Sequence, residues 1–154
     1  MQLSKNLSLA EMLRSESAKR NGIKNEPTAE HLENMKQLAL HVFQPIREHF
    51  GMPIHISSGY RSKELNKAIK GSQTSQHSKG QAMDIDMDNT ALKNSVLFHW
   101  IKDNLIFDQL IWEFGTKANP DWVHVSFVAE GKGTNRKQVL VAKKIDGKTV
   151  YQNW

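Results

Sequence analysis

The chain has 154 residues, a length that suits one domain, and we expect residues 1–154 to fold around a single hydrophobic core. It contains no cysteine, which excludes disulfides, thiolate metal sites and a cysteine nucleophile, so any metal ion must be held by His, Asp or Glu. The formal net charge of +5 fits an acidic cell-wall polymer or simple solubility better than nucleic acid, because the 21 Lys and Arg residues are spread along the chain and no nucleic-acid-binding motif is present.

The N-terminal residues 1–6 lack the charged and apolar sections of a secretory signal. No apolar run approaches the roughly 20 residues that a membrane helix needs. We therefore expect no membrane insertion and a protein that stays in the cytoplasm, where it is made. Ser8 followed by Glu11 has the spacing of a capping box and predicts a short helix over residues 7–14.

A longer helix is predicted after Pro27, with Thr28 as its N-cap. Its apolar residues recur at helical spacing: Leu32, Met35, Leu38, Ala39, Val42, Phe43 and Ile46. This pattern predicts the main core helix, with an irregularity at residues 40–44 because Pro45 lacks an amide hydrogen. The histidines of this segment have no second ligand type at a useful spacing and are expected to be structural or surface residues: His31, His41 and His49.

Residues 54–58 alternate apolar and polar side chains and predict a short strand that bends at Gly59. Arg61 leaves the end of this strand beside the glycine turn, a place where rigid scaffolds often present functional side chains. Ser62 is the expected N-cap of a helix over residues 63–69, and a polar loop follows.

The stretch from residue 75 to residue 86 organises the chain. His77 and Asp84 lie seven residues apart, joined by a loop that contains Gly80. Met83 and Ile85 fall on one side of a period-2 pattern, which predicts a strand with Asp84 on its other side. Because Gly80 lets the loop fold back, the imidazole and the carboxylate can meet, and together they form half of a zinc site.

Asp84, Asp86 and Asp88 also alternate like the start of a calcium-binding EF-hand loop. That loop needs Gly where this chain has Asn89 and a bidentate Glu where it has Ser95, so a calcium site is not expected. We instead expect Asp86 to support the metal ligands and Asp88 to cap a helix over residues 90–104.

Strands are predicted over residues 109–114 and 121–127, and a final hairpin over residues 138–142 and 148–151, turning at Asp146-Gly147. The whole pattern predicts an α+β fold in which helices pack on one side of a mainly antiparallel sheet, with the site at strand ends on the open face.

The strand over residues 121–127 supplies the missing part of the site. Val123 and Val125 share one face, which leaves His124 on the other. Asp121 stands at the strand entrance, where a turn can swing its carboxylate towards His124. Two imidazoles and a carboxylate form a three-ligand catalytic zinc set with an open fourth position, and Asp121 is a nearby carboxylate that could act as a base: His77, Asp84 and His124 are the expected ligands.

Three motifs of the chain are Ser58-Gly59-Tyr60-Arg61-Ser62, Ser75-x-His77-x-x-Gly80-x-Ala82-x-Asp84 and Asp121-Trp122-Val123-His124. Together they resemble peptidase family M15, the zinc D-Ala-D-Ala carboxypeptidases and dipeptidases. That family includes phage endolysins that cut the L-alanyl-D-glutamate bond, and it shares its fold with the hedgehog signalling domain. The motifs span roughly residues 54–128, and the pattern around residues 9–45 is also similar to small members from phage and bacterial genomes.

The resemblance implies a role for each matched position. The zinc ligands fall on His77, Asp84 and His124, and the catalytic carboxylate falls on Asp121. The substrate-orienting arginine falls on Arg61, and Ser75 occupies the position of the substrate-side serine. Several members, including the dipeptidases, have Glu where this chain has Asp121, whereas the endolysin-like members have Asp.

The implied activity is hydrolysis of peptide bonds in peptidoglycan stem peptides, of the D-Ala-D-Ala carboxypeptidase or the L-Ala-D-Glu endopeptidase type. It needs one Zn²⁺ per chain and no organic cofactor. The zinc ion would lower the pKa of its water, Asp121 would take the proton, and Arg61 would stabilise the developing oxyanion or hold a substrate carboxylate.

The presence of Asp121 favours this activity over the alternative, a non-catalytic zinc-containing binding module of the same fold. We expect a monomer that binds neither nucleic acid nor membrane. The sequence leaves two settings open: wall recycling by a cytoplasmic enzyme, or lysis by a phage-encoded enzyme that reaches the cell wall through a separate pore.

Overall fold

The fold is built on a six-stranded sheet with the order β3-β4-β6-β5-β7-β8, in which only the β5–β7 pair is parallel. The computed structural model describes residues 1–154. The strands of this sheet are β3 (Ile56–Ser58), β4 (Ala82–Ile85), β5 (Gln109–Glu113), β6 (Trp122–Ser126), β7 (Gln138–Ile145) and β8 (Lys148–Asn153), and a small N-terminal hairpin pairs β1 (Gln2–Ser4) with β2 (Leu7–Ser8). The predicted α+β fold with a mainly antiparallel sheet is confirmed.

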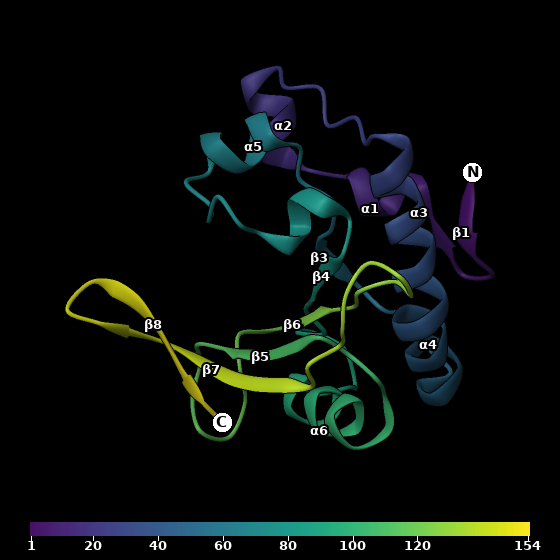
Figure 1. The fold of residues 1–154 in the computed structure, drawn as a ribbon. Coiled ribbons are helices and arrows are strands. Elements are labelled where there is room, and N and C mark those ends of the chain that lie inside the picture. Colours follow the sequence, from purple (N-terminus) through teal and green to yellow (C-terminus); the bar gives the residue numbers. More distant parts are fainter.

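The chain forms six α-helices: α1 (Leu9–Leu13), α2 (Glu16–Asn21), α3 (Ala29–Leu38), α4 (Gln44–Phe50), α5 (Lys63–Ala68) and α6 (Asn94–Asn104). Figure 1 shows α6 below the sheet, α3 and α4 along one side, and α2 and α5 above β3 and β4. None of these helices combines the length and the apolar composition that spanning a membrane requires.

The capping signals in the sequence start the helices where they were expected. The Ser8 hydroxyl accepts a hydrogen bond from the Glu11 amide at 3.3 Å, and the Glu11 carboxylate accepts one from the Ser8 amide at 2.9 Å. Thr28 and Ser62 cap α3 and α5 in the same way. Asp88 does not cap α6, whose N-cap position is Lys93, so that expectation was wrong.

The irregularity predicted from Pro45 takes the form of a π-helical turn over Ala39–Phe43, between α3 and α4. Pro45 cannot donate to the carbonyl four residues earlier, and the chain shifts to the wider hydrogen-bonding pattern before α4 begins. Both sides of the turn remain in the core, since Val42 and Ile46 are fully buried.

Strand alternation divides the sheet into two faces with different roles. On one face, Met83, Leu110 and Val125 join the main core of 25 buried residues, together with Leu97 and Phe98 of α6. On the other face, Asp84 and His124 lie directly opposite each other on β4 and β6. Helix packing on the first face therefore leaves the second face open for the polar residues.

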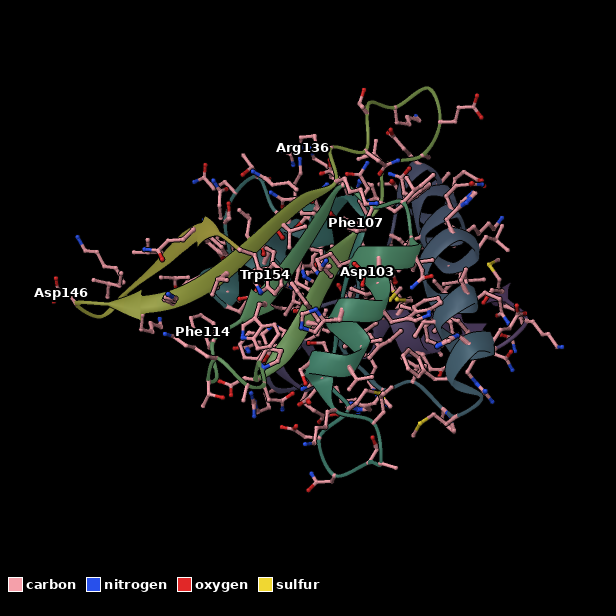
Figure 2. The ribbon with its side chains drawn as sticks, turned by 90° about the horizontal axis from the view of Figure 1, so that it is seen from below. Asp103, Phe107, Phe114, Arg136, Asp146 and Trp154 are labelled. Carbon is pink, nitrogen blue, oxygen red and sulfur yellow. The ribbon has the colours of Figure 1, made fainter.

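The β7–β8 hairpin turns at Asp146 and Gly147, both with positive φ, as the Asp-Gly signal predicted. Figure 2 shows Asp146 at the tip of this hairpin, far from the helices. The chain returns to the body of the protein at its end, where the Trp154 ring packs against Phe98 and His99 of α6.

Asp108, the residue directly before β5, links two other segments of the chain through its side chain. Its buried carboxylate accepts hydrogen bonds from Arg136 Nε and Nη2, both at 2.8 Å, and from Gln76 Nε2 at 2.9 Å. Gln76 belongs to the 3₁₀ turn Gln76–Lys79 that carries His77. The hydrogen bonds from Arg136 lower the pKa of Asp108 below its ordinary 3.8.

We expect Arg136→Met to lower the free energy of unfolding by about 2–3 kcal/mol at neutral pH, because it leaves a buried carboxylate without its charged partner. The folded-state pKa of Asp108 is depressed, so the ion pair stabilises the fold above pH 3.8 and its contribution is lost as the pH falls below that value. Urea unfolding at neutral and acidic pH measures this difference. Lys19→Met, which breaks an exposed pair with Glu16, is the control and should change little. An Arg136→Met deficit that is equally large in acid would contradict the account.

Candidate metal centre

Three elements deliver the predicted ligands to one point on the open face of the sheet. His77 lies in the 3₁₀ turn before β4, Asp84 lies in β4, and His124 lies in β6. Gly80 ends the turn with φ of 70°, a left-handed conformation that favours glycine. Its Cα also packs so closely on the His31 carbonyl that a side chain at this position would clash.

The donor atoms of the three residues have the mutual distances that a metal ion requires. Asp84 Oδ1 lies 3.3 Å from His77 Nε2 and 3.0 Å from His124 Nδ1, and the two ring nitrogens are 3.3 Å apart. A tetrahedral ion with bonds of about 2.0–2.1 Å separates its ligand atoms by about 3.3–3.4 Å. The three residues are therefore placed to hold a metal ion.

Hydrogen bonding and burial set the protonation states that metal binding needs. His77 Nδ1 donates to the Gly59 carbonyl at 2.7 Å, which leaves the lone pair of Nε2 directed at the centre. Burial lowers the pKa of His77 below 6.5, so its ring is neutral at pH 7. Burial alone would raise the pKa of Asp84, but the neighbouring His77 and His124 outweigh it and hold that pKa well below its usual range. The set offers a carboxylate and imidazole nitrogens.

Arg61 lies beside the ligands, as its place after β3 suggested. Its Nη2 is 3.9 Å from Asp84 Oδ2, and its Nη1 donates to Asn66 Oδ1 at 3.5 Å. The backbone amide of Arg61 donates to the His77 carbonyl, which fixes the two segments together. Nε of Arg61 is buried and has no hydrogen-bond partner. Ser75 is half-buried at the start of the His77 turn, and its hydroxyl makes no hydrogen bond within the protein.

Asp121 precedes β6 and holds its place through its backbone. Its amide donates to the Glu113 carbonyl at 2.9 Å, and its carbonyl accepts from Asn94 Nδ2 at 3.1 Å. Its side chain is exposed and makes no hydrogen bond or ion pair, and it is not part of the group of potential metal ligands. The structure therefore brings His77, Asp84, His124 and Arg61 together and leaves the carboxylate of Asp121 in solvent.

Glu113 is a second carboxylate at the site, and the sequence analysis missed it. Ile111 pairs with His124 across β5 and β6, so Glu113, two residues later, points to the same face as His124. Its side chain is only 7% exposed and makes no hydrogen bond or ion pair with the protein. Burial raises the pKa of Glu113 to about 7, and the nearby charge of Asp84 adds to this effect against the opposing influence of His124 and Arg61.

The sequence did contain a signal for Glu113. The residue is a carboxylate directly after three apolar or aromatic residues of its strand. Strand alternation places its side chain on the same side as that of Ile111 and opposite to those of the core residues Leu110 and Trp112. The sequence does not give the pairing register of β5 with β6, and it is this register that places the Glu113 side chain on the same part of the sheet as His124.

Asp86 lies outside the group of potential metal ligands, and its contacts reach the site indirectly. Its Oδ1 accepts from the Asp88 amide and from Asn94 Nδ2, both at 3.0 Å. Asn94 Nδ2 is also within hydrogen-bonding distance of the Asp121 carbonyl. Asp86 thus helps to position the entrance of β6, which carries His124.

Comparison with known proteins agrees with the geometry. Residues 5–126 match the family model described as peptidase M15, and no match was found among curated proteins. The matched range includes all the residues of the site and ends before β7 and β8.

Proposed function

The chain belongs to the peptidase M15 family, and from this premise we propose that it hydrolyses peptide bonds in peptidoglycan stem peptides with one Zn²⁺ held by His77, Asp84 and His124. The observation that carries the proposal is the spacing of the three donor atoms, which at 3.0, 3.3 and 3.3 Å is close to the separation that a tetrahedral ion imposes on its ligands. Two imidazoles and one carboxylate are ligands that zinc takes in catalytic sites, where a fourth position stays open.

A bound zinc ion supplies an acidified water molecule and polarises the substrate carbonyl. In this proposal the chain's own residues bind and orient the substrate. Arg61, whose Nη2 lies 3.9 Å from Asp84 Oδ2, is placed to hold a substrate carboxylate or the developing oxyanion. Ser75, whose hydroxyl is unpaired at the start of the His77 turn, faces the substrate in this proposal.

Hydrolysis also needs a group that takes a proton from the attacking water, and two carboxylates are candidates. Asp121 is the one that the resemblance nominates, and its role stays a prediction. The geometry favours Glu113, because its buried carboxylate shares a face with His124 and Asp84, whereas that of Asp121 is exposed. We propose that a Glu113 carboxylate oxygen accepts this proton and passes it to the leaving amine.

The buried Glu113 also bears on the alternative of a binding module. Burial of the Glu113 side chain raises its pKa to about 7 and disfavours its charged form, which costs the fold stability at neutral pH. A site used only for structure or recognition has no use for such a group next to its metal ligands, whereas a peptidase has one. The peptidase is therefore the function that we propose.

The test is digestion of purified peptidoglycan by the zinc-loaded protein, with the released fragments identified by mass spectrometry. Loss of a terminal D-Ala would assign a carboxypeptidase, and fragments with a new N-terminal D-Glu would assign an endopeptidase. A zinc-loaded, folded protein that releases neither from walls or from soluble stem peptides would contradict the proposal.

A further inference from the structure

A polar cleft of about 930 Å³ opens between α3, α5 and the His77 turn, and of its lining residues the reaction described above uses only Ser75. It has no hydrophobic residue in its lining. Five lysines line it, and the only acidic residue is Glu30: the lysines are Lys63, Lys67, Lys70, Lys79 and Lys132. We call this the lysine cleft.

The positive charge of the lysine cleft is largely uncompensated. Glu30 is paired with Lys132 at 3.0 Å, and the other four lysines make no ion pair within the protein. Lys63 and Lys67 lie four residues apart on α5 and so share one face of that helix. A concave site with this charge raises the local concentration of anions.

Two buried polar atoms in the cleft wall lack hydrogen-bond partners. Ser78 Oγ is a donor and acceptor, and Asn34 Oδ1 is an acceptor. The amide nitrogen of Asn34 is occupied, because it donates to the Lys79 carbonyl at 2.8 Å. The two free atoms complement a ligand that carries both acceptors and N–H donors. A peptide with carboxylates has both, whereas a polyphosphate chain has no N–H.

The lysine cleft adjoins the metal centre. Ser75 and Ser78 line the cleft and flank His77 in one turn of the chain. Asn66 also lines it, and its Oδ1 accepts from Arg61, whose other terminal nitrogen is 3.9 Å from Asp84. One side chain, Arg61, therefore separates the cleft from the metal ligands.

We propose that the lysine cleft binds an acidic segment of the substrate peptide, next to the scissile bond, through the carboxylates of that segment. This inference rests on the proposed function for the identity of the peptide. The proposal also assigns a binding role to part of the positive charge behind the chain's net charge of +5.

The test is the double variant Lys63→Gln/Lys67→Gln, which keeps two good helix formers on an exposed face of α5. We expect it to weaken binding of a synthetic stem peptide with free carboxylates, and to raise KM, by about tenfold, with kcat unchanged. The same peptide with amidated carboxylates should bind both proteins equally weakly. Rising salt should weaken parental binding more than binding by the variant. Lys143→Gln/Lys144→Gln on β7, outside the cleft, is the matched control and should behave like the parental protein.

Binding is measured by calorimetry and turnover by hydrolysis of the peptide. The cleft proposal and the proposed function can therefore be contradicted separately. Charge-dependent binding without hydrolysis would support the cleft and contradict the proposed function. Equal binding of the free and amidated peptides, or no effect of the double variant, would overturn the cleft proposal. Tighter binding of polyphosphate than of the acidic peptide, lost in the same variant, would also overturn it, because the site would then prefer phosphate.

Discussion

Glu113→Gln should lower the turnover of a stem peptide by about 10²- to 10⁴-fold, which is the contribution expected of general-base catalysis. The amide is nearly isosteric with the carboxylate and leaves the ligand set untouched, so the variant should keep its metal ion and its fold. Because it cannot accept a proton, only the chemical step should suffer. The measurements are kcat, metal content and thermal melting of the parental and variant proteins.

Asp121→Asn is the matched comparison, since it removes the carboxylate that the resemblance nominates. Its side chain is exposed, makes no hydrogen bond or ion pair and lies outside the ligand group, so we expect turnover close to the parental rate. The opposite pattern, a large loss in Asp121→Asn and none in Glu113→Gln, would show that Asp121 takes the proton. Loss of metal from Glu113→Gln would make Glu113 a ligand rather than a base.

His124→Ala should lose the metal ion itself. Changes that only disturb the support of a metal ligand cost about 10- to 100-fold in affinity, and removal of one of three protein ligands should cost more. The expected result is a protein that contains no metal after dialysis and shows no turnover. His55→Ala is the control: this exposed histidine lies outside the ligand group, and its variant should keep both metal and activity.

Thermal melting gives a second readout for the same variant. A metal ion that binds only the folded state stabilises it, so a chelator should lower the melting temperature of the parental protein. His124→Ala should melt at the same temperature with and without the chelator. If His124→Ala retained stoichiometric metal and still responded to the chelator, His124 would not be a ligand.

Local sequence patterns were sufficient to predict those features of the site that depend on which face of a strand a side chain occupies. Asp84 and His124 were placed on one face by alternation alone, and Gly80 indicated that the His77 turn could fold back. The core helix and its irregularity at Pro45 also followed from local rules. The short β1 and β2 strands carry too few residues to show a period, and they were missed.

The remaining parts depend on which elements lie side by side. Glu113 joins the site because β5 pairs with β6 in one particular register, and a sequence does not state its register. The lysine cleft gathers residues from position 30 to position 132, and its charge was visible in the sequence only as a total. For Asp121 the motif was visible, but the direction of its side chain depends on the turn before β6.

The central claim is that hydrolysis depends on one zinc ion bound by His77, Asp84 and His124. The most direct measurement strips the protein of metal and follows hydrolysis of a stem peptide while zinc is returned in small steps. The account predicts no hydrolysis without metal and a linear rise that ends at one zinc per chain. Hydrolysis by the metal-free protein at the full rate, or none after one equivalent of zinc has bound, would contradict it.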